Sequence, residues 1–138
     1  MALPDAEEQA RRFARVRHAH RTEVQEDYVE LIADLIAERG EARATDLAER
    51  LGVTPATVAN TLNRLKRDGL IEMRPYRSIF LTPTGASMAT HSKQRHEVVV
   101  RFLMALGMSN EIAESDAEGL EHHLSEQTLE VMRNFSPS

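Results

Sequence analysis

The sequence of 138 residues contains no cysteine, and only 4% of its residues are aromatic. Without cysteine the chain has no disulfide, redox dithiol, cysteine nucleophile or thiolate metal ligand, so any metal ion must be held by oxygen and imidazole. No apolar run is long enough to cross a bilayer, and no signal-like stretch begins the chain. These absences favour a cytoplasmic protein that, if it binds metal, prefers a hard cation.

The composition is that of a folded, mostly helical protein. Hydrophobic residues make up 41% of the chain and charged residues 28%, with a formal net charge of −5. The charge is segregated: residues 54–81 carry five basic and two acidic residues, and residues 107–138 carry seven acidic residues and one basic residue. The first of these segments therefore suits DNA phosphates and the second suits cations.

Three segments are expected along the chain. Residues 1–22 carry five arginines and few large apolar side chains, which predicts a partly ordered basic arm, either mobile or weakly helical. Such an arm either faces solvent or reaches DNA. Apolar residues at helical spacing from Val24 to Arg39, ended by Gly40, predict the first long helix. Residues 23–84 are expected to form a DNA-binding domain, and residues 85–138 a helical metal-binding and dimerisation domain.

Residues 44–69 predict two helices around a tight connection, followed by a β-hairpin. Thr54 suits the cap of the second helix and Pro55 its first turn. The runs LIEMR and SIFLT then predict two short strands. This order is typical of a winged helix-turn-helix; the alternative is a purely structural three-helix unit. The residues expected to face DNA are Thr54, Pro55, Ala56, Thr57, Asn60, Thr61, Arg64, Tyr76 and Arg77.

The C-terminal segment predicts a helix over 86–106 and shorter helices capped by serines. Ser109, Ser115 and Ser125 are the expected cap residues. We expect this lobe to pair with a second copy of itself.

Acidic and histidine residues cluster in three predicted helices. Asp27 and Glu30 share one helix face, and Glu118, Glu121 and His122 have the same spacing, with His96 elsewhere in the chain. Ordinary explanations exist for each: a solvated helix face, a Ser115–Glu118 capping box, and a hydrogen-bonded core histidine. Two acidic faces brought together with an imidazole repel unless a cation joins them. Gly119, inside DAEGLEHH, weakens its helix and suggests the close approach of another segment.

The order and spacing of these motifs resemble a known family. DYVELI, the helix-turn-helix, FLTPTG, RHEVVVRFL and DAEGLEHHLS resemble the manganese transport regulator branch of the diphtheria toxin repressor family, from about Asp27 to Phe135. The resemblance implies a homodimer that binds an operator in double-stranded DNA when metal is bound, mainly to repress manganese uptake genes. Neither a membrane nor a small organic ligand is expected as a partner.

The same resemblance implies two Mn²⁺ ions per chain, with Fe²⁺, Zn²⁺ or Cd²⁺ as substitutes. Iron-responsive relatives place methionine and cysteine where this chain has Asp27 and Glu118, so its donors are harder. His123 is expected beside the site or in solvent. The implied ligands are Asp27, Glu30, His96, Glu118, Glu121 and His122.

Three alternatives are distinguishable by experiment. An Fe²⁺-responsive regulator of the same family responds to a different metal, and a metal-independent winged-helix regulator ignores chelation. A dimetal enzyme uses similar ligands, but the chain contains no Glu-x-x-His motif and no second histidine of a zinc-protease helix near His96. The sequence therefore favours a regulator over an enzyme.

Overall fold

The computed structural model describes residues 2–137, apart from the side chain of Arg77. The chain divides into two compact units, which we call the central unit (Gln25–Lys93) and the terminal unit (Met1–Val24 with Gln94–Ser138). Helices α1 (Ala6–Arg39) and α4 (Pro83–Ala105) each contribute residues to both units. The helices and one small hairpin confirm the predicted fold class. None of the described helices is long and apolar enough to span a membrane.

Helix α1 begins far earlier than the apolar pattern predicted. It starts at Ala6, so the part of the arginine-rich segment that follows is helical. No glycine or proline occurs between residues 5 and 39. Glu7 and Glu8 lie in the first turn, where carboxylates interact favourably with the helix dipole, and Arg11 pairs with Glu8 at 3.1 Å. The apolar pattern missed this stretch because its side chains are mostly exposed.

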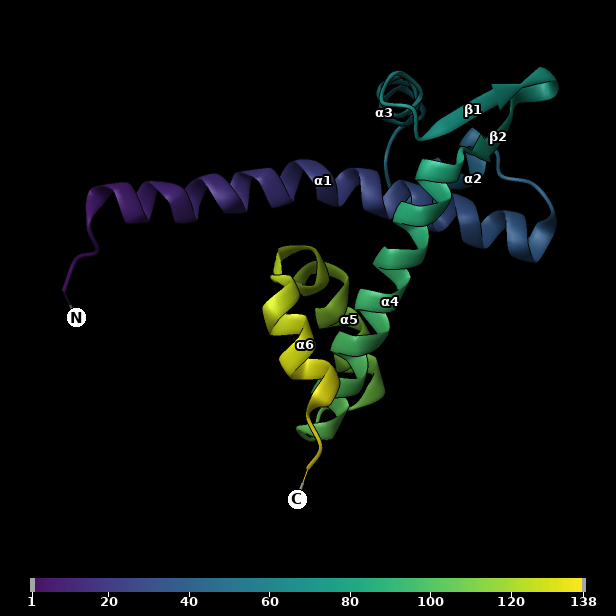
Figure 1. Ribbon diagram of the computed structural model, residues 1–138. Helices are drawn as coiled ribbons and strands as arrows, with labels where there is room; N and C mark the ends of the chain where they lie inside the picture. Colours follow the sequence, from purple (N-terminus) through teal and green to yellow (C-terminus); the bar gives the residue numbers. More distant parts are fainter. Residues whose placement is uncertain (1, 138) are drawn as a thin grey trace. The chain divides into compact units, whose positions relative to one another are not determined.

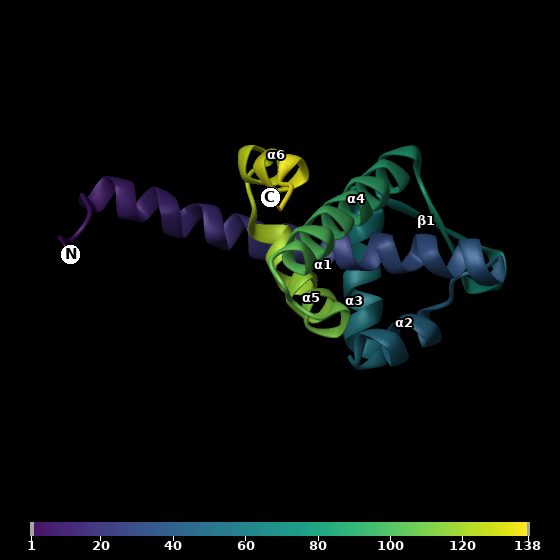
Figure 2. The same ribbon diagram turned by 90° about the horizontal axis from the view of Figure 1, so that it is seen from below.

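The central unit contains the predicted helix-turn-helix and wing (Figure 2). Helix α2 (Ala44–Leu51) ends at Gly52, whose φ of 68° lies in the left-handed region that glycine tolerates. Helix α3 (Pro55–Arg67) is capped by Thr54, whose side chain accepts from the Thr57 amide at 3.1 Å. Strands β1 (Ile71–Arg74) and β2 (Ser78–Leu81) pair antiparallel around the short helix η1 (Pro75–Arg77).

A tight backbone contact joins the wing to the start of α4. The Thr82 hydroxyl donates to the Gly69 carbonyl at 2.6 Å and accepts from the Gly85 amide at 3.1 Å. A Cβ on Gly85 would lie only 2.0 Å from the Leu70 carbonyl oxygen, so only glycine fits there. The core beneath is apolar and is formed by α1 together with α2, α3 and the hairpin; its largest fully buried side chains include Ile32, Leu47, Leu65, Ile71 and Ile79.

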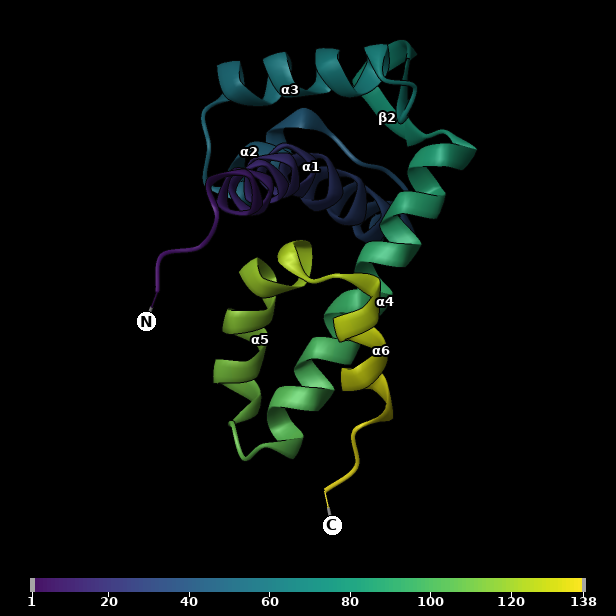
Figure 3. The same ribbon diagram turned by 60° about the vertical axis from the view of Figure 1, so that its left-hand side comes forward.

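The terminal unit is built on the second half of α4, with α5 (Asn110–Leu120) and α6 (Glu126–Asn134) beside it (Figure 1, Figure 3). The short helix η2 (Glu121–His123) joins α5 to α6. Ser109 and Ser125 cap α5 and α6 as predicted, each accepting from the amide three residues on. Ser115 lies inside α5, so the prediction that it caps a helix was wrong. The core here is smaller and includes Val99, Ala113, Ala117 and Leu129.

Candidate metal centre and DNA-binding surface

His96 is surrounded by carboxylates from α5 and η2, all within the terminal unit. Its Nδ1 lies 2.6 Å from Glu121 Oε2 and 4.0 Å from Glu118 Oε1, and its Nε2 lies 2.5 Å from Glu114 Oε2. Burial lowers the pKa of His96, but the hydrogen bond to Glu114 and the charges of Glu121 and Glu118 outweigh it and raise the pKa overall. In the absence of metal, the carboxylates therefore favour an imidazolium at His96.

Glu121 is the most deeply buried acid of this cluster. Its side chain is 1% exposed, and its other oxygen, Oε1, lies 3.4 Å from Nε2 of the buried His122. Removing a carboxylate from water costs several kcal/mol unless a cation or several donors compensate. A divalent ion that replaces the His96 proton would satisfy the same oxygens with a larger charge.

The structure brings together part of the predicted ligand set. Donor atoms of His96, Glu118 and Glu121 all lie within 4.8 Å of one another, close enough to hold one ion. His122 adjoins them through Glu121. Asp27 and Glu30 belong to the central unit, where Glu30 accepts from the buried Ser92 hydroxyl at 2.7 Å. Their role as ligands stays a prediction.

Sequence reasoning missed Glu114. The Glu114 carboxylate is within hydrogen-bonding distance of Nε2 of His96, so the other ring nitrogen, Nδ1, faces Glu118 and Glu121. Metal-binding histidines commonly donate their other N–H to a carboxylate that fixes the ring, and Glu114 is placed for that role. The signal was present, because residues 114, 118 and 121 recur at helical spacing on one face of the acidic segment.

Two expectations for the acidic segment are excluded, namely the capping box and the close approach at Gly119. Glu118 lies near the end of α5, so it cannot form a capping box with Ser115. The close approach predicted at Gly119 was also wrong, because a Cβ there would meet nothing within 4 Å. The low helical propensity of glycine marked Gly119 as unusual within a helix, but propensity does not show which other segments of the chain lie near it.

The exposed face of α3 carries most of the residues predicted to contact DNA. Thr54, Pro55, Ala56, Thr57, Asn60 and Arg64 are exposed, with Lys66 and Arg67 following at the end of the helix. Thr61 is the exception: only 4% of it is exposed, so the expectation that it faces outward was wrong. Its hydroxyl instead accepts from Arg64 Nη2 at 3.4 Å and helps to orient that side chain.

The hairpin tip presents Tyr76, as predicted for the wing. Tyr76 is 90% exposed and has a φ of 66°, a left-handed conformation that a bulky residue rarely adopts. The guanidinium of Arg74 stacks 4.1 Å above the Phe80 ring and packs the base of the tip. The predicted contact by Arg77 lies outside the described residues.

Comparison with known proteins decides the family. Residues 20–79 match the iron dependent repressor N-terminal DNA binding domain, and residues 82–136 match the iron dependent repressor metal binding and dimerisation domain. The chain belongs to the iron-dependent repressor family. This is the diphtheria toxin repressor family that the sequence motifs indicated, so the resemblance is confirmed.

Relatives within the iron-dependent repressor family are close in sequence and length. Transcriptional regulator MntR of Escherichia coli is 54% identical over 134 residues, which cover 97% of this chain and 86% of the relative. HTH-type transcriptional regulator MntR of Lysinibacillus sphaericus is 40% identical over 105 residues, 76% of each chain.

Solved structures of the same family share the fold. A manganese-dependent transcriptional repressor in complex with manganese aligns with a TM-score of 0.72 at 26% identity, and the manganese regulator SloR with a TM-score of 0.69 at 26% identity. Each alignment covers 78% of this chain. The chain spans about half the length of those two proteins, 50% and 51% respectively.

Proposed function

We propose that the protein is a Mn²⁺-responsive transcription regulator, mainly a repressor of manganese uptake genes. Metal binding raises the affinity of its homodimer for an operator in double-stranded DNA. The observation that carries this proposal is the set of carboxylates around His96, in a chain whose central unit is a winged helix-turn-helix. Relatives that are transcriptional regulators support this role over an enzymatic one.

The donor set suits a hard divalent cation. The gathered groups are carboxylates and one imidazole, and oxygen-rich sets favour Mn²⁺, although Fe²⁺, Zn²⁺ and Cd²⁺ bind the same donors. The proposal that Asp27, Glu30 and His122 are also ligands is supported by family membership. It is supported too by the need of two ions for more donors than His96, Glu118 and Glu121 provide. When bound, the ions would supply positive charge to these carboxylates, of which Glu121 is buried. The proposed ligands are Asp27, Glu30, His96, Glu118, Glu121 and His122.

The terminal unit also has the surface expected of a dimer. Its sequence matches a domain described as metal binding and dimerisation, and the unit exposes several large apolar side chains that a second copy could cover. In such a dimer two α3 helices reach successive half-sites in the major groove. This role places the protein in the cytoplasm with the DNA. In the C-terminal segment of the unit the exposed large apolar residues are Met104, Leu106, Met108, Ile112, Leu120, Val131 and Phe135.

The test is operator affinity, measured by fluorescence anisotropy at fixed salt on a duplex from the promoter of a manganese uptake gene. Wild-type protein should bind about 5- to 150-fold more tightly with saturating Mn²⁺ than with chelator. Glu121→Gln keeps the shape of the buried side chain but removes its charge, and should lower Mn²⁺ affinity by more than about 100-fold.

The matched control is Glu97→Gln, an exposed residue adjacent to His96 in the sequence, which should leave the Mn²⁺ response intact. A Glu121→Gln protein that still responds fully to Mn²⁺ would refute the proposed site. A response to Fe²⁺ at lower free concentrations than to Mn²⁺ would instead support the iron-responsive alternative.

A further inference from the structure

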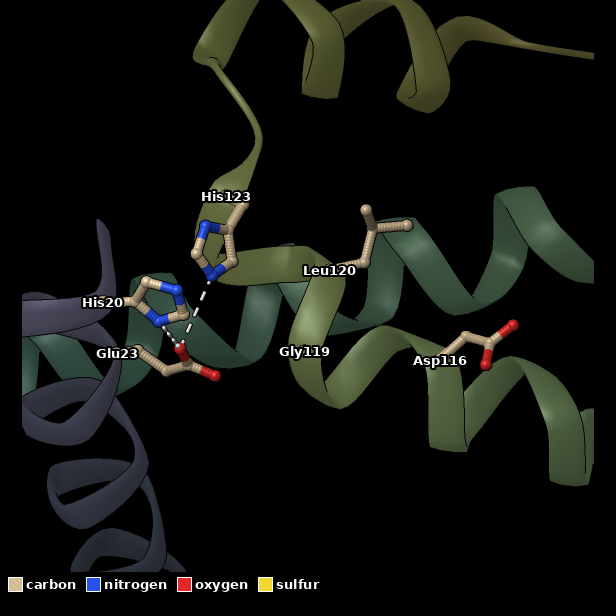
Figure 4. A pocket seen from close by; sticks show the side chains of 6 residues that line it. All are labelled: His20, Glu23, Asp116, Gly119, Leu120 and His123. Carbon is tan, nitrogen blue, oxygen red and sulfur yellow. Dashed lines mark ion pairs between the residues drawn. The ribbon is translucent and has the colours of Figure 1, made fainter. Parts of the chain in front are cut away.

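A second group of metal-binding residue types lies within the terminal unit, and none of its members belongs to the proposed manganese ligands. His20 and Glu23 come from the N-terminal half of α1, and His123 ends η2 (Figure 4). Glu23 Oε2 lies 3.4 Å from His20 Nδ1 and 3.5 Å from His123 Nε2. One carboxylate oxygen therefore lies between two imidazole nitrogens from segments about a hundred residues apart.

These separations match the spacing of ligands around a tetrahedral ion. With metal–ligand bonds of about 2.0–2.1 Å, the corners of a tetrahedron are about 3.4 Å apart. The distances of Glu23 Oε2 from the two nitrogens are close to this value, and all three donor atoms lie within 4.8 Å of one another. The two rings meet edge to face with their centroids 4.9 Å apart, so an ion needs only a small adjustment of the side chains.

The surroundings of the cluster favour a preformed site. Glu23 and His123 are 24% and 27% exposed, so both side chains are partly held by their neighbours, whereas His20 is 66% exposed. Arg15, five residues before His20 on α1, donates to the His123 carbonyl oxygen at 3.5 Å. The cluster opens onto a hollow lined also by Gly119 and Leu120, which leaves room for a water ligand. Asp116 lines the same hollow but points away from the cluster (Figure 4).

We propose that His20, Glu23 and His123 form a Zn²⁺ site, with water as the fourth ligand. Two imidazoles and one carboxylate are a softer donor set than the carboxylate-rich cluster around His96, and imidazole suits zinc. The ion cross-links the N-terminal half of α1 to η2, the helix that also carries Glu121 and His122. Zinc bound there stabilises the terminal unit independently of the manganese ligands.

The test uses a full-length background variant, Glu118→Gln with Glu121→Gln, in which the proposed manganese site is removed. Zn²⁺ is titrated into this protein by competition with a chromophoric chelator. We expect one Zn²⁺ per chain to remain bound. Adding His20→Ala, which removes one of three protein ligands on an exposed side chain, should lower that affinity by more than about tenfold. The control, His18→Ala, alters an exposed histidine of the same helix and should change nothing.

Limited trypsin digestion provides a second readout of the cross-link. Zn²⁺ should slow cleavage after the arginines of residues 11–21 in the background variant, and this protection should disappear with His20→Ala. Equal zinc affinity with and without His20, or no zinc bound to the background variant, overturns the proposal. Whether the background variant still responds to Mn²⁺ tests only the proposed manganese site. The manganese proposal and the zinc proposal can therefore fail separately.

Discussion

The two units differ in what they bury. Thirteen buried apolar residues form the core of the central unit, against six in the terminal unit, among the residues described. Among charged residues the central unit buries Glu26, whereas the terminal unit buries Glu121 and His122 and places the partly buried His96 against three carboxylates. The interior of the central unit is thus mostly apolar, whereas a larger share of the terminal unit's interior consists of ionic groups, whose burial cost depends on what neutralises them.

This difference separates structural stability from regulation. We expect apolar packing in the central unit to keep α3 and the wing in place whether or not metal is present. Four of the six proposed ligands lie in the terminal unit, so we expect most of the energetic effect of metal there. Substitutions in the apolar core should therefore change stability, whereas substitutions around His96 should change metal affinity.

The largest expected effect on stability comes from Gly85→Ala in the central unit. The new methyl group would lie 2.0 Å from a backbone carbonyl oxygen, which cannot move without distorting the start of β1. We expect a loss of about 3 kcal/mol in the free energy of unfolding, measured by urea denaturation. An unchanged midpoint would show that the contact between α4 and Leu70 is looser than described.

Arg64→Ala should weaken operator binding by about 1–3 kcal/mol while leaving Mn²⁺ affinity unchanged. Its side chain is exposed on α3 and held by the buried Thr61, so its loss removes a DNA contact rather than a core contact. Anisotropy and calorimetry measure the two affinities. Arg133→Ala, the same loss of charge on α6, is the control. A fall in Mn²⁺ affinity with Arg64→Ala would contradict the separation of roles.

Mn²⁺ affinity should fall as the pH decreases, because the ion competes with the proton on His96. The pKa of His96 is raised, and metal binds only the neutral imidazole, so below that pKa the affinity should drop by about tenfold per pH unit. Glu114→Gln removes a hydrogen bond that raises this pKa and should shift the loss of affinity to lower pH. Identical pH profiles for the two proteins would show that Glu114 does not act on His96.

The smallest effect is expected from Gly119→Ala in the terminal unit. A methyl group there meets nothing within 4 Å, and alanine favours the helix, so the protein should gain about 0.5–1 kcal/mol of stability. The same urea measurement that detects the loss in Gly85→Ala detects this gain. A destabilised Gly119→Ala protein would indicate that another surface packs against α5.

The sequence predicted the central unit well because its elements are marked by local chemistry. The Thr54 cap, Pro55, the tight connection between the two helices and the two strand-forming runs each act over a few residues, and the structure confirms them. The predicted outward position of Thr61 failed because its burial depends on tertiary packing, which helical periodicity alone does not resolve.

The terminal unit was harder to predict because its contacts are distant in sequence. His96 and the carboxylates around it are 18 to 25 residues apart, so spacing alone could single out Glu118 and Glu121 but not the ring orientation that involves Glu114. The pairing of His20 with His123 connects opposite ends of the chain, and no local pattern indicates it. The early start of α1 was missed because its side chains are largely exposed and charged.

The most direct test of the coupling between the two units is the Mn²⁺ affinity of the wild-type protein, free and saturated with operator DNA. Thermodynamic linkage requires DNA to tighten Mn²⁺ binding by the same factor by which Mn²⁺ tightens DNA binding, about 5- to 150-fold. We predict that increase at fixed pH and salt. Equal Mn²⁺ affinities with and without DNA would contradict the account, because the metal centre would then have no influence on the DNA-binding surface.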